Sequence, residues 1–254
     1  MAIDESILEA VSTGESAPTL RLYAWSPPCL SLGYAQPFSD IDVGRVTDRG
    51  WSVVRRPTGG RAILHTDELT YAVIAPIGHP DLAGGVIPSY QRLSKALLRG
   101  LELIGLAVTV SPEVQLSEAQ RINPVCFEVP SSYEIEVAGR KLLGSAQVRR
   151  VKGMLQHGTL PLTGDITRIC DALRFPDEQT RQGARQRVLS RAASVSELIH
   201  AEVSWERAAQ ALVQGFEDAL GWEFHETNLT SAELDRASDL ETNRYGNPDW
   251  TERI

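Results

Sequence analysis

Cysteine is scarce in this sequence, with three residues in 254. So few cysteines cannot form a disulfide framework, and their spacing contains no paired C-x-x-C metal site. The first residues, MAIDESILEAV, carry Asp4, Glu5 and Glu9 where a secretory signal needs positive charge and then an unbroken apolar run. No apolar stretch approaches the roughly 20 residues that span a bilayer. We therefore expect a cytoplasmic protein without a metal site and without a membrane segment.

Excess positive charge is also absent, because the formal net charge is -8. Proteins that bind nucleic acids in general neutralise phosphates with clustered Lys and Arg, so this charge balance argues against that class. Local basic clusters remain, and one of them comprises Arg181, Arg185, Arg187 and Arg191. Two interpretations of this cluster are open: a solvated helix face, or a docking surface for an acidic protein that carries the substrate.

The chain can bury a full core, because 42% of its 254 residues are hydrophobic. Apolar residues at helical spacing predict helices over residues 89–106 and Trp205–Leu220, the second ended by Gly221. Extended patterns predict strands over residues 20–25, 29–34, 51–55, 62–64, 69–75 and 151–160, with 62–64 paired to 69–75. The pattern indicates an α+β chain with a strand-rich part over residues 1–162 and a helical tail over residues 163–254.

A β-hairpin is predicted around a tight turn at Ala138-Gly139. Residues 133–137 alternate apolar and polar side chains, and extended character resumes over residues 141–148. Cys126 precedes this hairpin, and Lys141 lies on it. A thiol attacks as its thiolate, and a nearby cation lowers the pKa of a thiol, so the pair suggests acyl chemistry. The alternatives are a buried, apolar role for Cys126 and a solvated hairpin position for Lys141.

A second constellation is the segment RRPTGGRAILH, which runs from Arg55 to His65. A strand enters the turn Thr58-Gly59-Gly60 and another leaves it, so backbone N–H groups can approach a ligand closely there. The flanking arginines favour an anionic or carbonyl-bearing group. The spacing matches neither the P-loop nor G-x-G-x-x-G, and by itself a Gly-Gly pair indicates no more than a hairpin.

Together these segments closely resemble the biotin/lipoate protein ligase superfamily. RRPTGGRAILHTDELTYAV is similar to its R-R-x-T-G-G-x-A-x-x-H signature, and WSPPCLSLGYAQ resembles its first strands. GRKLLGSAQ and LQHGTL resemble its lysine motif and the adjoining strand. The resemblance implies the class II biotin/lipoate ligase catalytic fold over residues 1–254 as a single domain, a mixed and mostly antiparallel sheet flanked by helices. Arg61 departs from the pattern, because it stands where the family commonly has a third glycine, and it would crowd a nucleotide over the turn.

Within this superfamily, CFEVPSSYEI from Cys126 to Ile135 resembles the cysteine-dependent octanoyltransferase branch, which serves lipoate biosynthesis. The resemblance implies that Cys126 takes octanoate from octanoyl-acyl carrier protein as a thioester, and that Lys141 holds the acyl carbonyl. A lysine of a lipoyl domain, in glycine cleavage H protein or a 2-oxoacid dehydrogenase E2, would then attack the thioester. No cofactor is implied, because the donor is already a thioester. The other implied substrate-binding residues are Arg56, Thr58, Gly59, Gly60, His65, Gly144, Ser145, Gln147 and His157. The alternative for each of the two histidines is a hydrogen-bonded structural role.

Three alternatives stay open. An ATP-dependent lipoate-protein ligase would need ATP and magnesium and would be indifferent to the loss of Cys126. A lipoyl or octanoyl amidotransferase between lipoyl proteins would use the same cysteine. A catalytically silent acyl-binding or regulatory module is disfavoured by the presence of both Cys126 and Lys141. We expect a monomer that binds protein substrates and no nucleic acid.

Overall fold

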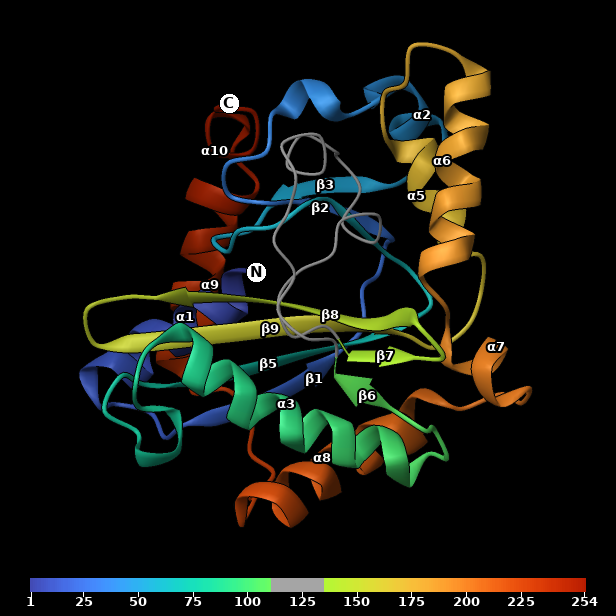
Figure 1. Cartoon of the computed structure of the whole chain (residues 1–254). Coiled ribbons are helices and arrows are strands. Elements are labelled where there is room, and N and C mark those ends of the chain that lie inside the picture. Colours follow the sequence, from blue (N-terminus) through green and yellow to red (C-terminus); the bar gives the residue numbers. More distant parts are fainter. Residues whose placement is uncertain (111–134) are drawn as a thin grey trace.

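The computed structural model describes residues 1–110 and 135–254 and contains two β-sheets (Figure 1). The large sheet has the strand order β1-β5-β9-β8-β7-β6, and the small sheet has the order β3-β2-β4. Figure 1 shows the large sheet across the middle of the molecule and the small sheet above it. The strands are β1 (Thr19–Tyr23), β2 (Cys29–Leu32), β3 (Ser52–Arg55), β4 (Ile63–His65), β5 (Glu68–Pro76), β6 (Thr109–Val110), β7 (Ile135–Val137), β8 (Arg140–Arg149) and β9 (Gly153–Pro161).

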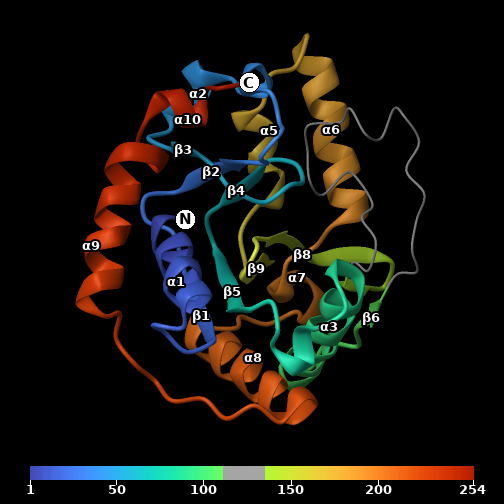
Figure 2. The same cartoon turned by 90° about the vertical axis from the view of Figure 1, so that its left-hand side faces the viewer.

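The large sheet is antiparallel at every described pairing and is covered by helices on both faces. Side chains alternate along β5, as the period of a strand requires. Tyr71 and Val73 pack with the cluster that includes α3 (Val86–Leu103) and α8 (Trp205–Leu220), whereas Ala72 and Ile74 pack with α1 (Ala2–Thr13). Figure 2 shows α1 and α3 on opposite sides of β5.

The small sheet is mixed, because β2 runs parallel to β3 and antiparallel to β4. Leu30 and Leu32 of β2 pack with the cluster that includes α2, α5 and α6, while Cys29 packs with Leu240 and Tyr245 near the C-terminus. The remaining helices of the described ranges are α2 (Val43–Asp48), α5 (Ile169–Ala172), α6 (Glu178–Arg191), α7 (Val195–Ile199), α9 (Ser231–Leu240) and α10 (Pro248–Thr251). A π-helical turn covers Glu241–Tyr245, and 3-10 turns cover Phe38–Asp40, Pro80–Leu82 and Ile166–Arg168. None of the helices in residues 1–110 and 135–254 combines the length and the apolar composition of a membrane-spanning segment.

The predicted fold class is confirmed: an α+β chain with a mostly antiparallel sheet, flanking helices and a helical C-terminal region. The predicted pairing of residues 62–64 with 69–75 is wrong. β4 pairs with β2 in the small sheet, whereas β5 pairs with β1 and β9 in the large sheet. The link Thr66-Asp67 lacks the Gly or Asn that a two-residue hairpin turn favours, and it carries the chain from one sheet to the other.

The predicted hairpin is confirmed where the structure describes it, because β7 and β8 pair antiparallel. Ala138 and Gly139 have φ values of 51° and 74°, as a type I′ turn requires at its two central residues. Cys126 and Tyr133 lie outside the described residues. The hairpin places Lys141 next to its turn, near the start of β8.

The end of β2 contacts the turn at residues 58–60 too closely to admit a side chain at Gly33. An added Cβ there would lie 1.9 Å from the carbonyl oxygen of Gly60. We expect Gly33→Ala to lower the free energy of unfolding by about 1–3 kcal/mol in urea titrations, because the backbone of Gly33 or Gly60 must move to admit the methyl group.

Gly59→Ala is the matched control for Gly33→Ala, since an added Cβ at Gly59 meets nothing within 4 Å. Its free energy of unfolding should change by less than about 0.5 kcal/mol. Equal losses in the two variants would contradict the close contact between β2 and the turn.

Candidate active site

A cavity of about 880 Å³ is bordered by both sheets. Ser31, Ile63 and His65 line it from the small sheet, and residues of β8 and β9 line it from the large sheet. The turn at residues 56–61 and the loop at residues 34–36 contribute the remaining wall, together with a few side chains from the chain ends. The lining therefore joins the two segments that carried the sequence resemblance.

The structure brings most of the predicted site residues together around this cavity. Thr58 does not line it, but is buried beside it, with Oγ1 2.7 Å from Nε2 of His157. Cys126 lies outside the described residues. The predicted residues that line the cavity are Arg56, Gly59, Gly60, His65, Lys141, Gly144, Ser145, Gln147 and His157. Their roles in catalysis and binding stay predictions.

Lys141 is buried in the cavity wall, with 4% of its surface exposed. A Cβ added at Gly144 would lie 3.4 Å from Cε and 3.8 Å from Nζ of Lys141, so the lysine side chain passes over the glycine backbone. The N–H of Ala193 donates to the Lys141 carbonyl oxygen at 3.1 Å, which fixes the strand at this point. A solvated hairpin position for Lys141 is therefore wrong.

His157 is a buried histidine with polar partners on both sides of its ring. Burial lowers the pKa of His157, although the carboxylate of Asp4 lies 4.0 Å from Nδ1 and opposes this shift. Asp4 is occupied by other donors, since Arg21 and the Tyr23 hydroxyl donate to it at 2.7 and 2.8 Å. The imidazole links β9 to Thr58 in the signature turn.

His65 is held by a buried carboxylate on one side and by a serine on the other. Its Nδ1 lies 2.6 Å from Oε1 of Glu68, and its Nε2 lies 2.8 Å from Oγ of Ser31. The hydroxyls of Thr70 and Thr159 donate to the same Glu68 oxygen at 2.5 and 2.7 Å. Glu68 therefore fixes the orientation of His65 and ties β5 to β9.

Removal of the Glu68 carboxylate should destabilise the fold. We expect Glu68→Ala to lower the free energy of unfolding by about 3 kcal/mol or more, because several buried donors lose their acceptor. Urea unfolding measures the loss, and Glu226→Ala is the control, since Glu226 is exposed. Unchanged stability in Glu68→Ala would contradict this role.

The two arginines of the signature shape the cavity wall by donating to backbone carbonyls. Arg56 donates to the carbonyl oxygens of Ser31, Gly59 and Arg61 at 3.0, 2.9 and 2.7 Å. Arg55 is fully buried and donates to carbonyl oxygens of residues 33, 34, 36 and 251. These bonds hold the turn and the neighbouring loop in place.

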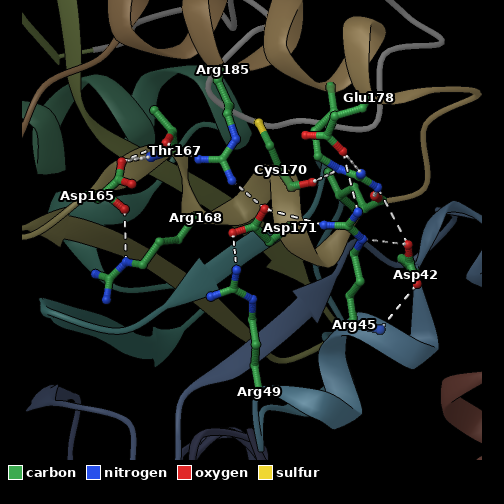
Figure 3. A network of polar contacts seen from close by, with 12 residues as sticks. Asp42, Arg45, Arg49, Asp165, Thr167, Arg168, Cys170, Asp171, Glu178 and Arg185 are labelled. Carbon is green, nitrogen blue, oxygen red and sulfur yellow. Dashed lines mark hydrogen bonds and ion pairs between the residues drawn. The ribbon is translucent and has the colours of Figure 1, made fainter.

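The helical arginine cluster is a solvated helix face only in part, because Arg187 and Arg191 are exposed whereas Arg181 and Arg185 pack against the protein. Arg181 is buried and pairs with Glu178 at 2.6 Å, and Arg185 pairs with Asp171 of α5. Arg49 also reaches Asp171, at 2.7 Å, so the carboxylate of Asp171 joins α6 to the α2 region (Figure 3). These two arginines of α6 stabilise the packing of helices beside the small sheet.

The other two cysteines are buried away from the cavity. Cys29 and Cys170 are buried, and burial raises the pKa of the Cys29 thiol to about 11. A thiol with so high a pKa carries little thiolate near neutral pH. Neither residue lines the cavity. No group of three or more metal-ligating side chains occurs in the described part of the chain.

Sequence reasoning missed several residues at this site, and only some had a local signal. Glu68 follows His65 by three positions, and that spacing could have suggested a partner for the histidine. Ser31 lies within a short apolar strand, where alternation alone gives no sign of its contact. Arg244 lines the cavity although it is 183 positions beyond Arg61, and no local pattern indicates such a contact.

Comparison with known proteins places this site in a family. The sequence model of the lipoyl protein ligase A/B catalytic domain matches residues 1–217. The chain belongs to this lipoyl protein ligase A/B family. Octanoyltransferase LipM of Moorella thermoacetica is 41% identical, over 100% of this chain and 93% of that protein. Octanoyltransferase LipM of Staphylococcus aureus is 36% identical, over 98% of this chain and 92% of that protein.

Solved structures of the lipoyl protein ligase A/B type share the fold. A bi-partite lipoate protein ligase from Thermoplasma acidophilum superposes with a TM-score of 0.81 at 24% identity, over 99% of this chain and 89% of that one. A lipoate-protein ligase A bound with ATP gives a TM-score of 0.79 at 24% identity, over 99% and 92%. At this identity the likeness establishes the fold alone, and it confirms the fold implied by the sequence resemblance.

Proposed function

We propose that this protein is an octanoyltransferase that moves an octanoyl group from octanoyl-acyl carrier protein to a lysine of a lipoyl domain through a thioester on Cys126. The observation that carries the proposal is identity of 35–41% to octanoyltransferases over nearly the whole chain. The buried Lys141 beside the cavity supports it. We expect the protein to act in the cytoplasm as a monomer.

The first step is a thiol–thioester exchange. The Cys126 thiolate attacks the carbonyl carbon of the donor, a new C–S bond forms, and the C–S bond to the carrier arm breaks. The carrier leaves as a thiolate, which takes a proton. One thioester replaces another, so the step needs no ATP.

The second step forms an amide. The deprotonated lysine nitrogen of the lipoyl domain attacks the same carbonyl carbon, and the C–S bond to Cys126 breaks. The proton that the nitrogen loses restores the thiol, and the enzyme returns to its starting state. The amide is the more stable product, which drives transfer forward.

Both steps pass through a tetrahedral intermediate with a negatively charged oxygen. A preorganised donor directed at such an oxygen typically contributes about 3 kcal/mol to the stability of the transition state. The amino group of Lys141, which is buried in the cavity wall, would be such a donor. We assign Lys141 to the acyl oxygen, and Arg56 and the turn at residues 58–60 to the shape of the acyl site.

The test compares donors in the presence of a lipoyl domain. Octanoyl-acyl carrier protein should give octanoylated lipoyl domain without ATP, as measured by intact mass. Free octanoate with ATP and magnesium should give none, and an octanoylated H protein should be a poor donor. Product only from free octanoate with ATP and magnesium would identify a ligase, and preferred use of the octanoylated protein would identify an amidotransferase.

A further inference from the structure

The cavity lining carries an excess of positive charge in a protein whose net charge is -8. Five arginines and Lys141 line it, and the described lining residues include no Asp or Glu. An octanoyl group is uncharged, and the acceptor lysine arrives as a cation before it loses its proton. Neither substrate group explains why arginines line the cavity, so we asked which of them is left to bind an anionic group.

Four of the lining arginines have partners in the structure. Arg56 donates to the backbone carbonyl of Arg61, and Arg149 donates to the backbone carbonyl of Gly85, both at 2.7 Å. Arg150 and Arg244 share the buried carboxylate of Glu5, at 3.1 and 2.7 Å. Their guanidinium groups are fixed in the wall.

Arg61 is the exception, because no residue in the described ranges pairs with its guanidinium group. Its backbone is nevertheless rigid, since the carbonyl oxygen of Arg61 accepts the Arg56 bond and Ala62 beside it is fully buried. Among the described residues, Arg61 is therefore the lining arginine whose guanidinium group is unpaired, and it extends from a fixed point on the turn.

The size of the cavity leaves room for such a group. An octanoyl chain occupies roughly 270 Å³ if each heavy atom takes the ~30 Å³ of a liquid water. The cavity of about 880 Å³ is much larger. The remaining space can hold part of the arm that delivers the acyl group.

We propose that Arg61 binds the phosphate of the phosphopantetheine arm of the donor, so that the enzyme selects phosphorylated thioester donors. The inference rests on the proposed transferase function. A carrier arm ends in a phosphodiester, which is an anion that can pair with the guanidinium group of Arg61. Arginine binds phosphate oxygens through paired N–H groups. Arg61, which stands where the family commonly has a third glycine, would thus act in recognition of the donor.

The test compares two small donors in transfer to a lipoyl domain: S-octanoyl-pantetheine, which is uncharged, and S-octanoyl-4′-phosphopantetheine. The wild-type protein should prefer the phosphorylated donor in kcat/KM by about 10- to 100-fold, as expected for a charge-assisted contact. Arg61→Gln should remove most of this preference, mainly through KM of the phosphorylated donor, and Arg61→Lys should keep part of it. Arg174→Gln is the control, since Arg174 is exposed and lies outside the cavity lining.

Two results would overturn the inference. The first is an unchanged preference in Arg61→Gln, with or without equal losses for both donors, and the second is a wild-type protein that shows no preference. A different pattern would overturn the transferase proposal as well: no transfer from any thioester, together with ATP-dependent use of free octanoate and a raised KM for ATP in Arg61→Gln. In that case Arg61 would bind a nucleotide phosphate instead.

Discussion

Replacement of Cys126 by alanine is expected to abolish octanoyl transfer, with a loss in kcat of about 10⁴-fold or more. The variant has no sulfur to accept the acyl group, and direct attack by the acceptor lysine on the carrier thioester lacks the enzyme-bound intermediate. The measurement is steady-state formation of octanoylated lipoyl domain from octanoyl-acyl carrier protein, followed by mass spectrometry.

The two described cysteines provide matched controls for this variant. Cys29→Ala and Cys170→Ala remove buried thiols away from the cavity, so each should keep most of the wild-type kcat at temperatures where it stays folded. A Cys126→Ala variant that retains activity would contradict covalent catalysis at this residue. Loss of activity only in Cys29→Ala would move the nucleophile to the small sheet.

Lys141→Met should lower kcat by about 10²- to 10³-fold with a smaller change in KM, because the lost cation acts mainly on the charge that develops in the transition state. Methionine keeps a similar length, so the fold should persist. Circular dichroism and urea unfolding verify the fold, and single-turnover kinetics report the chemical steps.

Lys152→Met is the control for charge removal, because Lys152 is exposed between β8 and β9. Its kcat should match that of the wild type. A large increase in KM with unchanged kcat in Lys141→Met would show that Lys141 binds substrate without stabilising the transition state. Unchanged kinetics would remove Lys141 from the mechanism.

Sequence patterns predicted those helices and strands whose structure depends on residues close together in the chain. The β7–β8 hairpin followed from alternation and from a turn that needs positive φ at Ala138 and Gly139. The helix Trp205–Leu220 followed from its apolar spacing and from Gly221, which adopts the left-handed conformation at its end. In both cases the residues that decide the structure are neighbours in the chain.

Contacts between distant segments were not predictable in the same way. The separation of β4 and β5 into two sheets depends on pairing with β2 and β9, and the sequence of residues 62–75 does not specify these partners. Arg244 reaches the cavity only because the C-terminal segment packs against Glu5 of α1. The motif residues could be grouped in advance by resemblance, but the lack of carboxylates in the described cavity lining emerged only from the three-dimensional structure.

Intact mass spectrometry of the protein after incubation with octanoyl-acyl carrier protein, without ATP and without acceptor, tests the central claim most directly. We predict a mass increase of one octanoyl group, located on Cys126 by peptide mapping, absent from Cys126→Ala, and removed when a lipoyl domain is added. Formation of octanoylated lipoyl domain without any such adduct, or an adduct on another residue, would contradict a Cys126 thioester as the intermediate.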